Sequence, residues 1–372
     1  MNRQLLDNIK NSMQSAYNLY CTTQIRIESK RGYKNFIKSY SEIERPDPHE
    51  YIQYWRRLSQ YVDPTGYQIH FTFTGKKDIQ FVPKEVYYTQ IEPCLNDYTM
   101  SKPYRDKNSY ERFYNFDVFP VAILRNIDGV FYNRAYQVIK INQVKDILDR
   151  LPKNYQRVML KPSILTGMRT NVRRIDLENE SLSLEYLNTK YERNYLIQEF
   201  VEQAKQFNQF GKTVSIRMNT YRSVVDNKIF VHDRGMAFNN DQNPDREQTS
   251  SDNISIDEFG RLGSFALNKH WRISRTVPNT DIQFSDFGEI PYFKEMQKAA
   301  SQIALASPYH RKIGMDMIVD KNGKVVVYEI NYDRLGFEII QYINGALFKE
   351  YTDEIIEYCK QRKSKIKFVF TR

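Results

Sequence analysis

Residues 314–331 run Gly314-Met315-Asp316-Met317-Ile318-Val319, then Asp320-Lys321-Asn322-Gly323-Lys324, then Val325-Val326-Val327-Tyr328-Glu329-Ile330-Asn331. Two β-rich runs on either side of an Asn-Gly turn predict a β-hairpin. Side chains two apart on a strand share a face, so Glu329 and Asn331 should project together, and the hairpin should bring Asp316 beside them. Two carboxylates and an amide oxygen suit Mg²⁺, which usually completes its shell with water and substrate phosphates. The same spacing also fits a solvated hairpin with ordinary polar residues.

A buried strand that ends on a lysine is the second feature. Arg157-Val158-Met159-Leu160-Lys161-Pro162 places Lys161 after three apolar residues and before a loop, where its ammonium group can meet a phosphate as a point charge. The loop, Ser163-Ile164-Leu165-Thr166-Gly167-Met168-Arg169, combines a glycine with small hydroxyl side chains and could cover a phosphate. Considered alone, such a lysine is more often a surface residue whose stem lies over apolar neighbours.

The third feature is an extended apolar run that ends in acidic and amide residues, Tyr195-Leu196-Ile197-Gln198-Glu199-Phe200-Val201-Glu202-Gln203. Backbone groups of such a segment can pair with the edge of an adenine, and Glu202 or Gln203 can accept hydrogen bonds from ribose hydroxyls. An ordinary buried strand would show the same pattern.

The order of apolar residues predicts the other elements. Helical spacing up to about residue 65 indicates an N-terminal helical cap. From Tyr67 to Phe73 the period changes to two, which predicts a strand, and a second β-rich run follows at 79–82. Further along, we expect a strand at 118–124, a helix around 144–149, a loop at 239–253, and a helix carrying the apolar face Met296, Ala299, Ala300, Ile303 and Ala304.

Composition limits the classes of function. The chain has 372 residues, 41% of them hydrophobic and 14% aromatic, which is enough for two or three lobes with separate cores and a ligand cleft. Lys and Arg exceed Asp and Glu by 55 − 45 = 10, so the surface should attract anions. The basic residues are scattered, so we expect no dedicated nucleic-acid partner.

The cysteines and the N-terminal residues indicate the cellular compartment in which the protein is expected. Cys21, Cys94 and Cys359 are isolated, without the spacing of a metal site, and are typical of a reducing compartment. The N-terminal residues are polar, and nowhere do about 18 apolar residues follow one another. We therefore expect a cytoplasmic protein, which could still touch a membrane surface.

Taken together and in this order, the features resemble the ATP-grasp superfamily, and more closely its sugar-transfer-associated branch. The resemblance runs from about Tyr87 to Gln341 and rests on six short motifs. They are Asp106-Lys107-Asn108 with Tyr110 ("DKN"), Leu160-Lys161-Pro162-Ser163 ("KPS"), Gln198–Gln203 ("QEF"), Val214–Thr220 with Arg217 ("NTxRxxT"), Ser251-Asp252-Asn253 ("DN") and Gly314–Asn331 ("GxD…ExN").

Two departures from the family pattern stand out. Members usually carry several glycines after "KPS", whose backbone N–H groups close on the phosphates. Here Gly167 is followed by Arg169, Arg173 and Arg174, which could replace part of that charge neutralisation. The change could also mean an altered phosphate geometry or a weakened enzyme. Near the "DN" loop, the usual glycine pair is replaced by Asp252-Asn253-Ile254-Ser255-Ile256-Asp257.

The resemblance implies an α/β (α+β) ATP-grasp fold, with two α/β subdomains that clamp ATP and an N-terminal helical or mixed lobe. The expected segments are a helical cap and pre-ATP-grasp lobe (1–100), a lid subdomain with Lys107 and Lys161 (101–195), a C-terminal subdomain with the metal hairpin (196–350) and a basic tail (351–372). The implied site residues are Arg217 and Lys161 for catalysis, Asp316, Glu329 and Asn331 for Mg²⁺, and, for ATP, Lys107, Lys161, Ser163, Gln198, Glu199, Phe200, Val201, Glu202 and Gln203.

The implied reaction is that of a carboxylate–amine ligase. ATP phosphorylates a substrate carboxylate, and an amine attacks the acyl phosphate, with ADP and phosphate as products. The resemblance to the sugar-transfer-associated branch and the excess of basic over acidic residues favour an acidic sugar of a capsule or O-antigen precursor as the carboxylate substrate. This sugar would be joined to an amino acid or small amine. Two alternatives stay open: a phosphotransferase acting on a sugar hydroxyl, and a nucleotide-binding regulatory subunit of a polysaccharide assembly complex.

Overall fold

The computed structural model of the chain describes residues 3–40, 45–164, 171–211, 214–238 and 251–362. The chain divides into two compact units. Unit 1 contains Met1–Ser101, Lys205–Asp316 and Asn331–Arg372, and unit 2 contains Lys102–Ala204 and Met317–Ile330. No helix among the described residues is both long enough and apolar enough to cross a bilayer.

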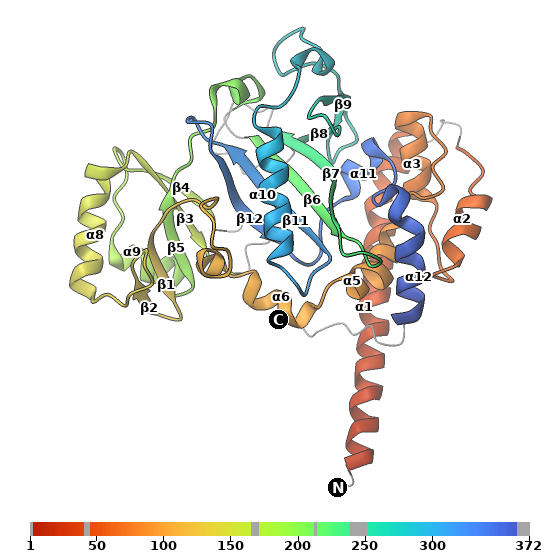
Figure 1. The fold of residues 1–372 in the computed structure, drawn as a ribbon, viewed down its shortest axis with the longest axis horizontal. Helices are drawn as coiled ribbons and strands as arrows, with labels where there is room; N and C mark the ends of the chain where they lie inside the picture. Colours follow the sequence, from red (N-terminus) through yellow and green to blue (C-terminus); the bar gives the residue numbers. More distant parts are fainter. Residues whose placement is uncertain (1–2, 41–44, 165–170, 212–213, 239–250, 363–372) are drawn as a thin grey trace. The chain divides into compact units, whose positions relative to one another are not determined.

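One sheet of the described residues, whose strands β6 to β10 belong to unit 1, has the order β10-β9-β8-β7-β6-β11-β12 (Figure 1). Its strands are β6 (Val214–Arg222), β7 (Ile229–Phe238), β8 (Asp252–Ile256), β9 (Leu262–Leu267), β10 (Ile273–Ser274), β11 (Lys312–Val319) and β12 (Val325–Asn331). The β11–β12 hairpin passes from unit 1 into unit 2 and returns. It confirms the strands and turn predicted at 314–331. Its turn ends on Gly323 with φ +85°, a conformation that glycine adopts without steric cost.

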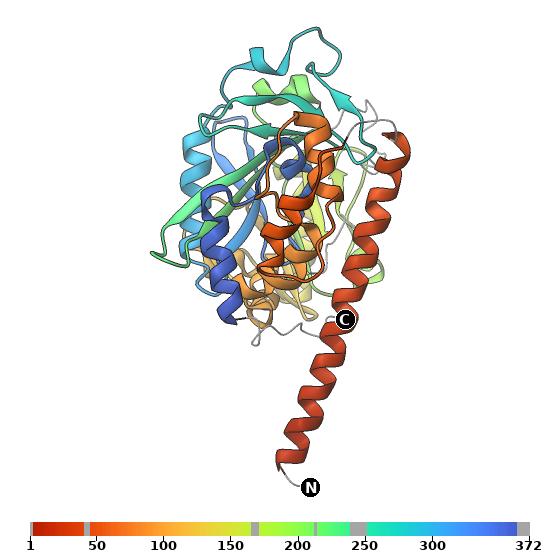
Figure 2. The same cartoon turned by 90° about the vertical axis from the view of Figure 1, so that its right-hand side faces the viewer.

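Helices cover this sheet and build the aromatic core of unit 1. They are α1 (Arg3–Ser39), α2 (His49–Arg56), α3 (Thr65–Thr74), α4 (Lys84–Val86), α5 (Glu92–Leu95), α10 (Phe293–Leu305), α11 (Glu338–Asn344) and α12 (Thr352–Arg362). α10 contacts β6 and β7, and α11 contacts β7, β8 and β9. The core contains Tyr33, Phe36, Tyr51, Trp55, Tyr87, Phe337 and Phe348, which explains the high aromatic content. Figure 2 shows the N-terminal half of α1 extending beyond the other helices of its unit.

The strand predicted at Tyr67–Phe73 is wrong, because this segment is helix α3. The Asp63 carboxylate accepts a hydrogen bond from the N–H of Thr65 at the start of the helix, and Gly75, with φ +69°, ends it. α3 packs against both α1 and α11, so apolar residues are needed on more than one side. A helix enclosed in this way lacks the single apolar stripe that helical periodicity detects.

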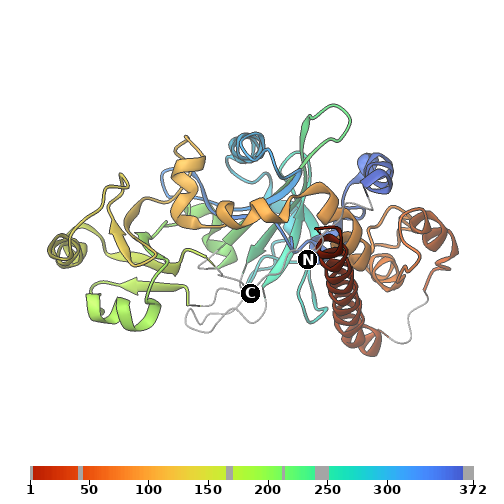
Figure 3. The same ribbon diagram turned by 90° about the horizontal axis from the view of Figure 1, so that it is seen from below.

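In the described part of unit 2, strands form a second sheet with the order β2-β1-β5-β3-β4. Its strands are β1 (Ala122–Ile127), β2 (Val130–Tyr132), β3 (Arg157–Pro162), β4 (Arg173–Asp176) and β5 (Tyr195–Glu199), and all the neighbouring pairs are antiparallel. Helices α8 (Ile141–Asn154) and α9 (Leu184–Tyr191) lie on the same face of it (Figures 1 and 3). The short helices α6 (Tyr98–Tyr104) and α7 (Tyr110–Phe113) precede this sheet along the chain.

Some of the other predicted helices and strands are confirmed by the structure, and others are not. The helix around 144–149, the strand at 157–162 and the helix that carries Met296 are confirmed as α8, β3 and α10. The strand expected at 118–124 begins four residues later, at Ala122, and the β-rich run at 79–82 forms no strand. The loop predicted at 239–253 falls mostly outside the described residues, but its last two residues, Asp252 and Asn253, open strand β8. The "DN" segment is therefore a strand rather than a loop.

Candidate functional site

In unit 1, Arg217 on β6 and Asp316 on β11 form a bidentate ion pair. Arg217 Nε lies 2.7 Å from Oδ1 of Asp316, and Nη2 lies 2.9 Å from Oδ2. The amide nitrogen of Asn331 on β12 donates to the same Oδ2 at 3.3 Å. The predicted phosphate-facing arginine and two of the three predicted metal ligands are thus brought together. Charge-assisted bidentate pairs fix orientation as well as adding stability.

A row of polar residues that the sequence analysis missed continues from this pair. Asn219, two residues after Arg217 on β6, donates to Oδ2 of Asp233 on β7 at 2.7 Å. Lys312 on β11 is fully buried, and its ammonium group has no hydrogen-bond partner among the described residues. Burial raises the pKa of Asp233. It lowers the pKa of Lys312 to about 8, although the nearby Asp233 opposes that shift.

The sequence contains a pattern that indicates part of this row of polar residues. Lys312, Gly314 and Asp316 alternate along one strand and therefore share a face. A side chain on Gly314 would meet Oδ1 of Asn219 and Cδ2 of Leu335, and it would lie 3.4 Å from Nη1 of Arg217. Glycine at this position lets β11 approach the polar side chains of β6.

In unit 2, the two predicted phosphate-binding lysines lie near the third predicted metal ligand. Nζ of Lys107 is 3.1 Å from Oε1 of Glu329, and Nζ of Lys161 is 3.4 Å from the carbonyl oxygen of Tyr328. Both lysines are buried, with 7% of each exposed. Burial lowers the pKa of Lys161 to about 7; Lys107 lowers it further, and Glu329 opposes the shift.

Local hydrogen bonds hold these lysines in place. Lys107 opens the 3-10 turn η2 (Lys107–Ser109), in which the Asp106 carboxylate accepts from the N–H of Asn108. The N–H of Lys107 donates to the carbonyl of Ser163 at 2.9 Å, so the "DKN" and "KPS" motifs touch through the backbone. The hydroxyl of Ser163 is buried and has no partner among the described residues.

The predicted adenine segment begins on β5. The Gln198 side-chain nitrogen lies 3.5 Å from the carbonyl of Pro120, and its Oε1 is buried without a partner in the described part of the chain. Oε1 of Glu199 accepts from the N–H of Val121 at 2.9 Å. Glu199 is therefore engaged in bracing the segment before β1.

Beyond β5, the chain runs beside the turn of the β11–β12 hairpin. The ring of Phe200 lies under the guanidinium groups of Arg157 and Arg174, and Val201 is half-buried. Glu202 pairs with Lys321 at 3.0 Å, and Gln203 forms a β-bridge with Asp320.

The arginines expected to compensate for missing glycines are only partly described. Gly167 and Arg169 lie outside the described residues. Arg173 on β4 pairs with Glu180 at 2.6 Å and bonds to the hydroxyl of Tyr186. The charge of Arg173 is thus matched by a carboxylate of its own unit.

Comparison with known proteins gives a family match and distant structural likenesses. The model described as "Sugar-transfer associated ATP-grasp" matches residues 168–356, just over half of the chain. No curated protein matches. D-alanyl-alanine synthetase A from Vibrio cholerae O1 biovar eltor str. N16961 is similar at 6% identity and a TM-score of 0.39, over 69% of this chain and 64% of that chain.

VanG D-Ala:D-Ser ligase from Enterococcus faecalis is similar at 11% identity and a TM-score of 0.37, over 68% of this chain and 61% of that chain. The chain therefore spans less than two thirds of the length of these two structures.

The family match confirms the resemblance and the fold class expected from the sequence. The two antiparallel sheets and the N-terminal helices are the α/β elements of an ATP-grasp fold, and ATP-grasp enzymes use ATP and Mg²⁺. The chain belongs to the sugar-transfer associated ATP-grasp family.

Proposed function

We propose that the chain is an ADP-forming carboxylate–amine ligase that joins an amino acid or small amine to an acidic sugar of a capsule or O-antigen polysaccharide or its precursor. Family membership supports the use of ATP. The matched model's association with sugar transfer, together with the net charge of +10, supports an acidic sugar as the substrate. The ligases among the similar structures act on amino acids, as their names state, and at their low similarity they add nothing on the substrate.

The observation that carries the proposal is the burial of Lys161 near Lys107. Burying two ammonium groups is unfavourable unless an anion compensates them. Glu329 contacts Lys107, while the pKa of Lys161 is lowered to about 7. An incoming phosphate would supply the missing negative charge and favour the protonated form of Lys161. We infer that these lysines bind phosphates of ATP, with the unpartnered hydroxyl of Ser163 as a further donor.

The donor set also fits Mg²⁺. Asp316, Glu329 and Asn331 offer hard oxygens, and Mg²⁺ in nucleotide sites is commonly held by one or two carboxylates together with phosphates. When bound there, Mg²⁺ would neutralise charge on the phosphates of ATP. Arg217, held in orientation by Asp316, would stabilise the negative charge that develops on the transferred phosphoryl group.

In the two proposed chemical steps, the protein forms no covalent bond with the substrates. The substrate carboxylate attacks the γ-phosphorus of ATP, the bond from γ-phosphorus to the β,γ-bridging oxygen breaks, and ADP leaves. The amine then attacks the acyl carbon, phosphate leaves, and the amine loses a proton. Catalysis rests on positioning and charge neutralisation. The segment Gln198–Gln203 would hold the adenosine, with Glu202 or Gln203 accepting from the ribose hydroxyls.

An assay of the purified chain with Mg–ATP tests the proposal. A panel of uronic acids is combined with a panel of amino acids, and ADP, phosphate and product mass are measured. Release of ADP and phosphate that requires both substrates, with an amide product, supports a ligase. ADP together with a stable phosphorylated sugar would show a phosphotransferase instead. ATP binding without turnover on any pair would favour a regulatory subunit.

A matched pair of lysine variants tests the site assignment. Lys161→Ala should weaken binding of a non-hydrolysable ATP analogue at least tenfold. Lys145→Ala removes an exposed lysine of α8 in the same unit and should leave the affinity unchanged. Equal affinities of the two variants would contradict the role of Lys161.

A further inference from the structure

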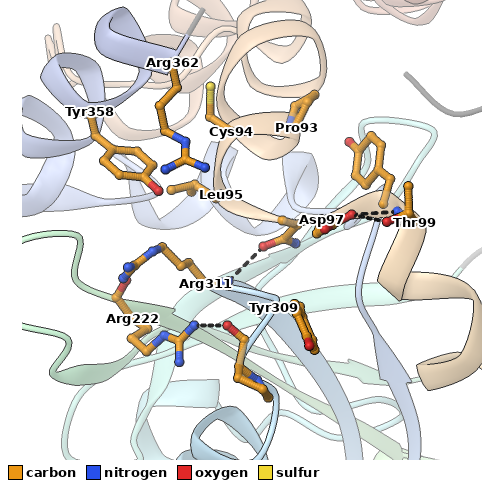
Figure 4. Close-up of a pocket in the computed structure, with 13 residues that line it drawn as sticks. Pro93, Cys94, Leu95, Asp97, Thr99, Arg222, Tyr309, Arg311, Tyr358 and Arg362 are labelled. Carbon is orange, nitrogen blue, oxygen red and sulfur yellow. Dashed lines mark hydrogen bonds between the residues drawn. The ribbon is translucent and has the colours of Figure 1, made fainter. Parts of the chain in front are cut away.

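A cavity of about 540 Å³ lies in unit 1, lined by α5 and the residues that follow it, the end of β6, the segment that precedes β11 and the end of α12. This volume falls in the range of small-molecule sites. Figure 4 shows that arginines from three elements reach it: Arg222 is the last residue of β6, Arg311 directly precedes β11, and Arg362 ends α12.

The cavity is distant from the proposed catalytic residues of the same sheet. Arg222 lies five residues beyond Arg217 on β6, which is roughly 17 Å at about 3.4 Å per residue. Arg311 lies five residues before Asp316, and the N–H of Arg222 donates to the carbonyl of Arg311 at 2.7 Å. The cavity therefore lies at one end of this pair of strands, whereas the ion pair of Arg217 lies near their middle.

The lining carries uncompensated positive charge. The lining residues carry three guanidinium groups and one carboxylate, that of Asp97, so the net charge of the lining is 3 − 1 = +2. Asp97 accepts from the backbone and hydroxyl of Thr99, at 2.9 and 2.6 Å. Among the described residues, none of the three arginines has a carboxylate at ion-pair distance. Two of them are close enough that Arg311 helps to lower the pKa of Arg222, after burial, which is the larger cause.

The polar contacts of Arg222 and Arg311 are with backbone and amide oxygens, and one buried donor of Arg222 is left without a partner among the described residues. Arg311 Nη1 donates to the carbonyls of Arg222 and Ser223 and to the side chain of Asn227, which fixes its guanidinium group. Arg222 donates to the carbonyl of Pro308, while its Nε is buried without a partner in the described part of the chain. A buried unsatisfied donor is costly and is typical of a place that a ligand or ordered water completes.

An aromatic ring completes the site. The guanidinium carbons of Arg311 and Arg362 lie 5.7 and 5.0 Å from the centre of the Tyr358 ring, and Tyr98 and Tyr309 also line the cavity. Arginine forks match the oxygens of a phosphate, and tyrosine rings offer both an apolar face and a hydroxyl to a sugar ring. We propose that this cavity binds a phosphorylated small molecule, a sugar phosphate in chemical class, at a site separate from that of ATP.

Calorimetric titration with glucose 1-phosphate tests the proposal. The full chain is first saturated with Mg²⁺ and a non-hydrolysable ATP analogue, so that the ATP site is filled, and ionic strength is held constant with chloride. Inorganic phosphate, glucose and glucuronate are titrated in parallel. We expect glucose 1-phosphate to bind at one site, inorganic phosphate to bind more weakly, and glucose to give no signal. Binding of glucuronate without binding of glucose 1-phosphate would overturn the assignment to phosphate.

Variants separate specific binding from a general effect of charge. Arg362→Gln and Arg222→Gln should each weaken the affinity for glucose 1-phosphate at least tenfold. Arg56→Gln removes one positive charge from an exposed position on α2 of the same unit and should leave the affinity within about twofold of the wild type. Equal losses in all three variants, or affinity retained in both Arg362→Gln and Arg222→Gln, would refute the proposal.

Arg362 is the decisive position if Arg222→Gln disturbs folding. Its guanidinium group lies over the Tyr358 ring and forms no ion pair with the described residues, so its replacement should not unfold the unit, which a thermal unfolding curve checks. Arg362→Lys keeps the charge but loses the fork, and should bind with intermediate affinity. An Arg362→Lys variant that binds no better than Arg362→Gln would contradict a site that depends on charge.

Discussion

Arg217 and Asp316 form a two-point ion pair between adjacent strands, with distances of 2.7 and 2.9 Å, and both side chains are largely shielded from water. Each was predicted from the sequence to take part in phosphoryl transfer, but in different roles. The pair shows that the proposed metal ligand also orients the proposed phosphate-facing arginine. Removing either residue should therefore affect the other.

The first prediction concerns the coupling within this pair. Arg217→Ala leaves the Asp316 carboxylate without its bidentate partner, and we expect a loss of about 1–3 kcal/mol in the free energy of unfolding. A double-mutant cycle with Asp316→Ala, measured by urea unfolding, should give a coupling energy of similar size. The more exposed pair of Arg261 and Asp257 is the control, and its coupling should be about 0–1 kcal/mol. Coupling no larger than that of the control would show that the Arg217–Asp316 pair is not maintained in solution.

The second prediction concerns the pH dependence of stability from Lys312. Its pKa is lowered by burial to about 8, whereas an unfolded lysine has a pKa of about 10.4. Between these values the unfolded chain binds more protons than the folded chain. The contribution of Lys312 to the free energy of unfolding therefore rises with pH in this window, by at most about 1.4 kcal/mol per pH unit.

Lys312→Met should remove that rise. Urea unfolding gives the free energy of unfolding of the wild type and of the variant at pH 7.5 and pH 9.5. The difference between the two proteins should change between these pH values, and taking the difference cancels the titration of the other groups. Lys298→Met, at an exposed position on α10, should follow the wild type at both pH values. A difference between wild type and Lys312→Met that stays constant over this range would contradict a lowered pKa.

The third prediction concerns the close approach at Gly314. An added methyl group would press on Asn219, whose amide is held by Asp233, and on Leu335. We expect Gly314→Ala to lower the free energy of unfolding by about 1–3 kcal/mol, a typical result of overpacking. Gly336→Ala is the matched control, because nothing lies within 4 Å of its added methyl group. Equal stability of the two variants would mean that the strands relax to admit the side chain.

Local patterns predicted the parts of the site that depend on neighbouring residues. The β11–β12 hairpin follows from two β-rich runs and a turn glycine, and Lys161 follows from a strand that ends in a lysine. Asp233 could not be found in this way. Its importance comes from Asn219 on the next strand and from burial of Lys312 on β11, and a single sequence carries no signal for such contacts.

The error at α3 has a related cause. Tyr67, Ile69, Phe71 and Phe73 alternate as in a strand, but the segment is surrounded by α1 and α11, so the alternation reflects burial on several sides. The boundaries were nevertheless visible, since Pro64 precedes the helix and Gly75 ends it. Boundary residues would have been the better guide here than periodicity.

The fourth prediction separates a ligand role from a structural role at Glu202. Its ion pair with Lys321 is 3.0 Å long, but both side chains are substantially exposed, so the pair should add less than about 1 kcal/mol to stability. If Glu202 accepts hydrogen bonds from the ribose of ATP, Glu202→Ala should weaken binding of a non-hydrolysable ATP analogue about tenfold, the effect of losing one charge-assisted hydrogen bond. Lys321→Ala breaks the same ion pair from the other side and should leave the affinity nearly unchanged. Calorimetric titration of both variants distinguishes the two roles, because equal losses of affinity would assign Glu202 to holding the β11–β12 turn rather than to the nucleotide.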